Sequence, residues 1–219
     1  ISYYYFGYLT LGLPGVISGI SSSVVYNLAL VLLPAMAAAG MVSLVSTVVV
    51  RAGASLKIAI ALGVAGALLL SVFGNLEGFF EMLHAWGLGS DGFWGSVGIK
   101  GLESQGSSSS FFANDGWWWW RSSRVIDTVV AGSSLDFTIQ EYPFFSTYLG
   151  DLHPHVMSVP FVLLFLAFCL NLLADTVSIS VTWIRQRWFG VAMTGLLLGS
   201  LGFINAWDLP VFFAVLMGV

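Results

Sequence analysis

Charged residues are scarce in this chain: Asp, Glu, Lys and Arg make up 8% of its 219 residues, whereas 58% are apolar. The mean hydropathy is +0.91. Because a soluble domain carries about 25% charged residues, the composition predicts a protein that is solvated mostly by lipid. The net charge of −4 is small and dispersed, so no nucleic-acid partner is expected.

Cysteine and several catalytic motifs are also missing. The single Cys169 lies in an apolar run, which excludes an intrachain disulfide and leaves a cysteine metal site unsupported. The sequence has no glycine-rich phosphate loop, Ser/His/Asp arrangement or haem-attachment motif. No basic region followed by a short apolar region marks a signal peptide. Because the chain starts at Ile1 and stops at Val219 inside an apolar segment, we expect a fragment of a longer polytopic protein.

Long apolar runs dominate what is present, and each is close to the length that crosses a bilayer as a helix. The first segment, 1–20, opens with YYYFGY, and it fits either a spanning helix or a helix on the membrane surface. The later runs cover residues 24–50, 58–73, 160–174, 189–203 and the start of a fifth at 209–219. The predicted fold class is therefore all-α: a polytopic transmembrane protein with about four to six membrane or interfacial helices.

Basic residues in the short connections predict the topology. Arg51 and Lys57 flank the turn RAGASLK, and Arg185 and Arg187 lie in the connection after the third run. Both connections should face the cytoplasm of a plasma-membrane protein. One membrane domain would then cover residues 1–219, with one large extracytoplasmic loop at 75–157 and the INAWDLP turn on the same outer face.

The predicted outer loop holds nine of the eleven acidic residues. Its stretch GNLEGFFEMLHAWGLG predicts a short amphipathic helix, in which we interpret His84 as a surface histidine. The run of four tryptophans at 117–120 suits the membrane interface. Long connections of this kind are usually functional or disordered.

The stretch EYPFFSTYLGDLHPHVMSVP gathers Asp151, His153 and His155 at spacings of two residues, directly before an apolar run. If extended, the three side chains point to one side and suit a divalent cation. Pro154 favours a helix that starts behind it, which would place His155 at a helix N-terminus, a ready site for phosphate. The alternative is that Asp151 caps this helix and the histidines are interfacial.

Other polar residues of the outer side are further candidates. Glu141 would act as a base or second cation ligand, or as a solvated loop carboxylate. Arg121 and Arg124 share a helical face and would bind phosphate, or snorkel to lipid headgroups. Two more residues are taken as substrate-binding candidates: Trp120, the last of the tryptophans, and Asp208, which would meet the cluster from the INAWDLP turn or cap a helix.

Four stretches, SYYYFGYL, WWWWRSSRVI, IQEYPFFSTYLGDLHPHVMSVPF and GFINAWDLP, together resemble the "YYY" family of polytopic membrane proteins over almost the whole chain. That family looks like a relative of the C-type glycosyltransferases, which use lipid-phosphate-linked sugars at the outer membrane face. The resemblance implies that an acidic residue serving the acceptor precedes Ile1. It also implies roles for six residues: Glu141, Asp151, His153 and His155 bind a cation or the departing lipid phosphate, and Arg121 and Arg124 neutralise its charge.

These observations predict a membrane glycosyltransferase that uses a polyprenyl-phosphate sugar donor, with Mg²⁺ or Mn²⁺ as the expected divalent cation. Membrane lipid and other membrane subunits are the further partners considered. The rival hypothesis is a non-catalytic subunit of a larger membrane complex, with His153 and His155 binding pigment or metal or capping helices. A transporter is disfavoured because Asp175 lies near the inner end of its run and no ionisable group falls at mid-membrane.

Overall fold

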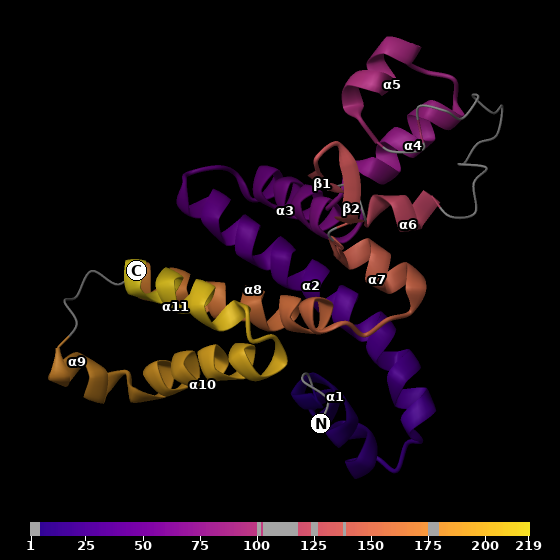
Figure 1. Ribbon diagram of the computed structural model, residues 1–219. Coiled ribbons are helices and arrows are strands. Elements are labelled where there is room, and N and C mark those ends of the chain that lie inside the picture. Colours follow the sequence, from indigo (N-terminus) through magenta and orange to yellow (C-terminus); the bar gives the residue numbers. More distant parts are fainter. Residues whose placement is uncertain (1–4, 100–101, 103–117, 124–126, 138, 175–179) are drawn as a thin grey trace. The chain divides into compact units, whose positions relative to one another are not determined.

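The computed structural model describes residues 5–99, 102, 118–123, 127–137, 139–174 and 180–219 (Figure 1). The chain divides into two compact units, each described by itself. The first unit comprises Ile1–Ser71 and Gly150–Val219, and the second comprises Val72–Leu149. The second unit overlaps most of the predicted outer loop.

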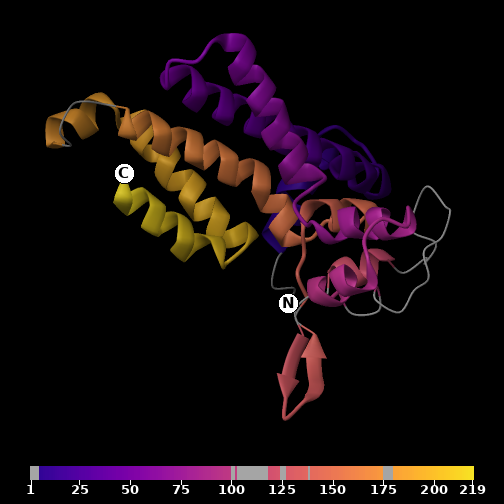
Figure 2. The same ribbon diagram turned by 90° about the horizontal axis from the view of Figure 1, so that it is seen from above.

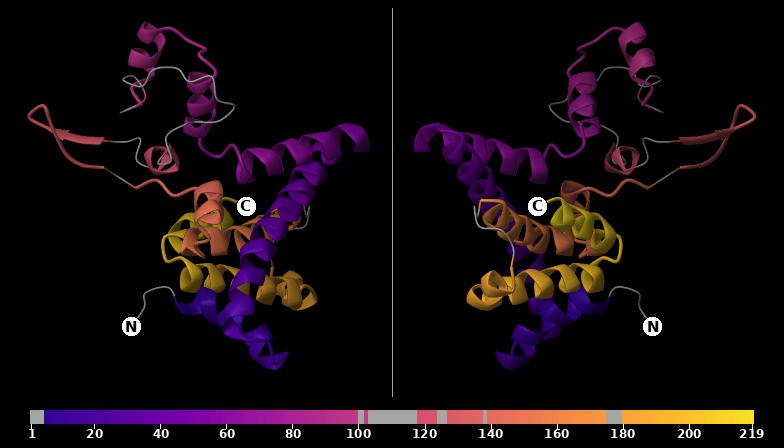
Figure 3. Two further views of the ribbon diagram at one scale, coloured as in Figure 1. Left: turned by 90° about the vertical axis from the view of Figure 1, so that its right-hand side faces the viewer. Right: turned by 90° about the vertical axis from the view of Figure 1, so that its left-hand side faces the viewer.

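The first unit is built from helices whose apolar composition made them visible in the sequence. Their bounds are α1 Tyr5–Ile17, α2 Ser22–Arg51, α3 Leu56–Ser71, α8 Pro154–Leu173, α9 Val181–Gln186, α10 Trp188–Ile204 and α11 Asp208–Gly218. Helices α2 and α3 form a hairpin (Figure 3), α8 packs against both α2 and α10, and α11 contacts both α8 and α10 (Figure 1).

Two of the described helices, α2 and α8, are long and apolar enough to cross a membrane, and α1, α3, α10 and α11 are shorter apolar helices. The predicted helical membrane protein is confirmed. Ser21 occupies the N-cap of α2 but makes no side-chain cap hydrogen bond. The hairpin depends on close approach: a Cβ at Gly63 of α3 would lie 2.8 Å from the carbonyl oxygen of Val42 in α2.

Two clusters of buried side chains hold the first unit together. One consists of Ala29, Leu33, Leu152, Met157 and Ile204, and joins α2, the segment before α8, α8 itself and α10. The other lies between α8 and α10 and includes Cys169, which is a buried small hydrophobe and free of disulfides. The first cluster holds the N-terminal end of α8, which carries the predicted site residues Asp151, His153 and His155.

Basic residues of the first unit lie near the C-terminal end of α8, at the end opposite its candidate site residues. The Arg51 guanidinium lies 3.4 Å from the carbonyl oxygen of Leu170, near the C-terminal end of α8. Arg187 lies beside Leu172 at that same end, and its guanidinium sits 5.9 Å from the ring centroid of Trp183. The two basic connections therefore lie together, as predicted, away from the N-terminus of α8. Their cytoplasmic location stays a prediction.

The second unit contains short elements: α4 Glu77–Ala85, α5 Asp91–Val97, α6 Trp118–Ser122, β1 Asp127–Val130, β2 Ser133–Phe137 and α7 Pro143–Leu149. Helix α4 confirms the predicted amphipathic helix. The antiparallel hairpin β1–β2 (Figure 2) was not predicted. The expectation of a surface His84 is wrong, because its side chain is buried and packs edge-on against Trp94, with ring centroids 5.0 Å apart.

Candidate functional site

The N-terminus of α8 forms as the proline pattern predicts. Pro154 is the first helical residue, and His153 is the N-cap with extended backbone angles of −68° and 145°. His153 therefore lies in the approach to the helix and His155 in its first turn. Asp151 does not cap the helix, and its side chain contacts His153 instead. The helix-capping alternative for Asp151 is excluded by this geometry.

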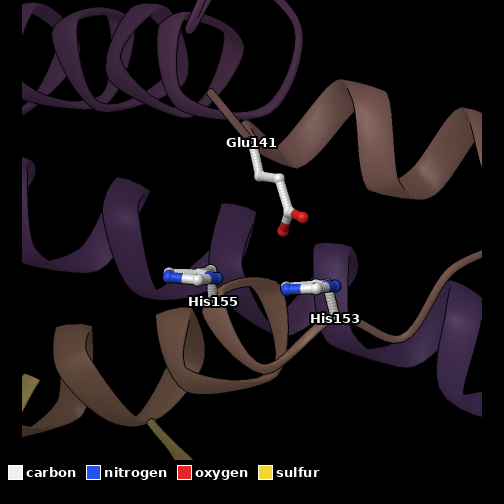
Figure 4. A group of neighbouring side chains, drawn as sticks. All are labelled: Glu141, His153 and His155. Atoms are coloured by element: carbon white, nitrogen blue, oxygen red, sulfur yellow. The ribbon is translucent and has the colours of Figure 1, made fainter. Parts of the chain in front are cut away.

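Asp151, His153 and His155 form a continuous polar row. Oδ2 of Asp151 lies 3.1 Å from Nδ1 of His153, and the rings of His153 and His155 are nearly parallel, with centroids 5.2 Å apart and an angle of 7° (Figure 4). Each histidine offers a ring nitrogen within 4.8 Å of the other's. When Nδ1 of His153 carries the proton and donates to Asp151, its Nε2 is left as an acceptor or metal ligand.

Tyr26 of α2 anchors the segment that carries this row. Its hydroxyl donates to the carbonyl oxygen of Gly150 at 2.9 Å and lies 3.4 Å from the backbone nitrogen of Leu152. Gly150 has a φ of +68°, in the left-handed region that favours glycine. Tyr8 of α1 also interacts electrostatically with Asp151 of this row. Sequence reasoning missed both tyrosines as site residues.

An apolar cleft of about 250 Å³ lies between α1 and α2 and reaches this anchor. Its walls are mostly aliphatic, and Tyr8, Tyr26 and Leu152 also line it. The full lining is Tyr8, Leu11, Gly12, Val16, Ile20, Ser22, Val25, Tyr26, Ala29 and Leu152. An apolar chain in the cleft would thus end beside the polar row.

Asp208 lies at the start of α11, close to the same end of α8. Its Oδ1 accepts a hydrogen bond from Nδ2 of Asn205 at 3.0 Å. Burial raises the pKa of Asp208, while Ser158, His155 and Asn205 each lower it. The structure therefore places Asp208 near His155, from the INAWDLP turn. Sequence reasoning missed Ser158 and Asn205.

The other candidates belong to the second unit. Arg121 is held by Glu81: its Nε donates to Oε1 at 2.8 Å, and its Nη2 lies 2.7 Å from the same oxygen. Trp120 is 43% exposed, and Glu141, also labelled in Figure 4, is half-buried. Arg124 lies outside the described residues. The substrate and catalytic roles predicted for these four residues stay predictions.

Buried carboxyls in the second unit were not predicted. Glu77 and Glu81 are 3% and 2% exposed, one turn apart on α4. Burial raises the pKa of Glu77 to about 9; the neighbouring Glu81 raises it too, and Arg121 lowers it. The signal in the sequence was the i, i+4 spacing of two acids on an amphipathic helix, but it gives no sign of which side is buried.

Comparison with known proteins gives one match. The model of a family described as "Uncharacterized membrane protein (DUF2298)" matches residues 1–219. None of the curated proteins and none of the solved structures compared with the chain matches it.

Proposed function

The chain belongs to the DUF2298 family of membrane proteins, and we propose that it is the membrane part of a glycosyltransferase. In this proposal a sugar carried on a lipid phosphate is transferred at the outer membrane face. Fold-level likeness alone would be a weak basis for such a function, and the chemistry of the first unit is what supports the proposal.

The observation that carries the proposal is the adjacency of an apolar cleft and a polar row. The cleft between α1 and α2 is lined by aliphatic side chains and reaches Tyr26 and Leu152. Tyr26 in turn contacts the segment that leads to Asp151 and His153. A polyprenyl phosphate consists of an apolar chain, which would suit the cleft, and an anionic head, which would suit the polar row.

The polar row supplies groups suited to a departing phosphate. The acceptor hydroxyl attacks the anomeric carbon, the bond from that carbon to the phosphate oxygen breaks, and the phosphate leaves with the electron pair. A ring N–H of His155 and the N-terminus of the 20-residue helix α8 stabilise the new charge. Asp151 orients His153 through its Nδ1. A divalent cation such as Mg²⁺ or Mn²⁺, for which Asp151 would supply the oxygen ligand that these ions prefer and His153 and His155 ring nitrogens, would neutralise further phosphate charge.

The hydroxyl proton goes to a carboxylate base, for which Glu141 and Asp151 are the candidates in this chain. Arg121 is a weaker candidate for phosphate recognition than the sequence indicated, because a phosphate would compete with Glu81 for its guanidinium. Trp120, with its 43% exposed side chain, and Arg124 remain candidates for contacts with the lipid or the donor.

The alternative is a non-catalytic subunit, and one observation favours it. Helix α11 has no buried residue among those described, so the apolar side chains that do not pack against α8 and α10 are left for lipid or for a neighbouring membrane subunit. In that case the histidines would bind a metal or another group without performing transfer.

A transfer assay on the full-length protein in nanodiscs separates these functions. Sugar transfer from polyprenyl-phosphate donors is compared between wild type, Asp151→Asn and the control Asp91→Asn, whose carboxylate is exposed at the start of α5. We expect at least a tenfold loss of kcat in Asp151→Asn and wild-type rates in Asp91→Asn. Unchanged transfer in Asp151→Asn would remove Asp151 from the mechanism. Absence of transfer with every donor would favour the subunit.

A further inference from the structure

The turn between α10 and α11 contains two buried oxygen atoms that lack a hydrogen-bond partner in the described part of the chain. One is Oδ1 of Asn205, a residue only 2% exposed, and the other is Oδ2 of Asp208. Buried acceptors are normally satisfied by protein or by ordered solvent. Two of them within one four-residue turn would suit a ligand that carries positive charge or protons.

The orientation of the Asn205 amide is fixed by its neighbour. Its Nδ2 donates to Oδ1 of Asp208 at 3.0 Å, and rotating the amide by 180° would place two acceptors against each other. The backbone of the turn is also fixed, because the N–H of Asp208 donates to the carbonyl oxygen of Asn205 at 3.0 Å. Oδ1 of Asn205 is therefore left without a donor by the fold itself.

A third oxygen comes from α8. Ser158 is 3% exposed, and its hydroxyl interacts with the Asp208 carboxylate. The hydroxyl proton has a separate acceptor, the carbonyl oxygen of His155 at 3.0 Å. The lone pairs of Oγ are then available to a ligand of the Asp208 carboxylate. The three atoms are an amide oxygen, a carboxylate oxygen and a hydroxyl oxygen, the ligand types that Mg²⁺ and Ca²⁺ prefer.

The charge balance of the first unit favours a cation over water alone. All four Lys and Arg residues in the sequence ranges of this unit lie in its two basic connections, away from Asp208 at the other end. His155 partly compensates the charge of the Asp208 carboxylate, and a bound cation would add to this compensation where a water molecule would not. We propose that Ser158, Asn205 and Asp208 form a site for a hard divalent cation, Mg²⁺ or Ca²⁺, that is separate from the His153–His155 pair and independent of the transferase function.

Titration with Mn²⁺ tests this site directly. The full-length protein in detergent is titrated at pH 8, and free Mn²⁺ is measured by electron paramagnetic resonance. We expect wild type to bind Mn²⁺ in competition with Mg²⁺. The variants Asp208→Asn and Asn205→Leu should weaken this binding at least tenfold, and Ser158→Ala should weaken it several-fold.

His153→Gln is the matched control, because it removes a ring nitrogen of the other candidate cation site and leaves the three oxygens in place. Binding that persists in His153→Gln and is lost in Asp208→Asn supports the proposal. Size-exclusion profile and melting temperature identify any variant that fails to fold, and the small Ser158→Ala change then decides. The proposal is overturned if wild type binds no Mn²⁺, or if Asp208→Asn and Ser158→Ala bind it as wild type does.

Discussion

The buried carboxyl of Glu77 gives the sharpest prediction for the stability of the second unit. Its pKa is raised from 4.5 to about 9, first by burial and then by the neighbouring Glu81. The folded state therefore holds a proton at neutral pH that the unfolded state has released. The contribution of Glu77 to the free energy of unfolding is fully present below about pH 4.5 and is lost as the pH rises toward 9. Glu77→Gln, which cannot ionise, should remove that loss.

The size of the effect follows from the two pKa values. A pH of 7 lies about 2.5 pH units above the pKa of the carboxyl in the unfolded state, and each unit corresponds to about 1.4 kcal/mol of unfolding free energy. Wild type should therefore lose about 3 kcal/mol between pH 4.5 and pH 7 through Glu77. At pH 7 Glu77→Gln should unfold several degrees above wild type, with the gap widening toward pH 9 and closing near pH 4.5.

Thermal unfolding of the purified protein, followed by tryptophan fluorescence between pH 5 and 9, measures this gap. Glu81→Gln is the matched control, since it removes the partner of the Arg121 guanidinium and should lower the melting temperature. A Glu77→Gln variant that melts below wild type by the same amount at every pH would refute the reasoning. It would mean that Glu77 is ionised in the folded protein and needed in that form.

Three further substitutions test the packing of the first unit, each by melting temperature in detergent. Gly63→Ala should cost about 1–3 kcal/mol, because its Cβ would lie 2.8 Å from the backbone carbonyl oxygen of Val42. Gly7→Ala should cost less, since the nearest atoms are the flexible end of a methionine; equal losses in the two variants would contradict this. Tyr26→Phe should cost about 1 kcal/mol and speed hydrogen exchange in segment 150–152, and unchanged exchange there would show that the hydroxyl does not anchor it.

The helices of the first unit were predictable because a lipid-solvated helix needs a long apolar run, and few other structures produce one. The hairpin of the second unit was not predictable in the same way. Its strands are short, and its turn uses Ala131 at a φ of +52° before Gly132. A non-glycine residue in that conformation is uncommon. The Gly- and Ser-rich composition of the predicted outer loop therefore gave no indication of the compact second unit.

The local geometry of the candidate residues was predictable where the sequence signal was local. The spacing of Asp151, His153 and His155, with Pro154 between the histidines, was enough to place a helix start and a polar row. Prediction failed for contacts across long sequence separations: Glu81 and Arg121 are 40 residues apart. No local pattern indicates such a pair.

A chain with few charged groups must satisfy each buried one in some specific way, and the structure shows different solutions. Glu81 is neutralised by Arg121, and Glu77 keeps its proton. The carboxylate of Asp208 receives one amide donor from Asn205, and its Oδ2 and the amide oxygen of Asn205 remain without partners among the described residues. No Lys or Arg of the first unit lies at that end, where His155 and Ser158 interact with the carboxylate, and the proposed cation would satisfy the two remaining oxygens. The unpartnered oxygens of the turn before α11 are therefore a stronger indication of a cation site than His153 and His155 are.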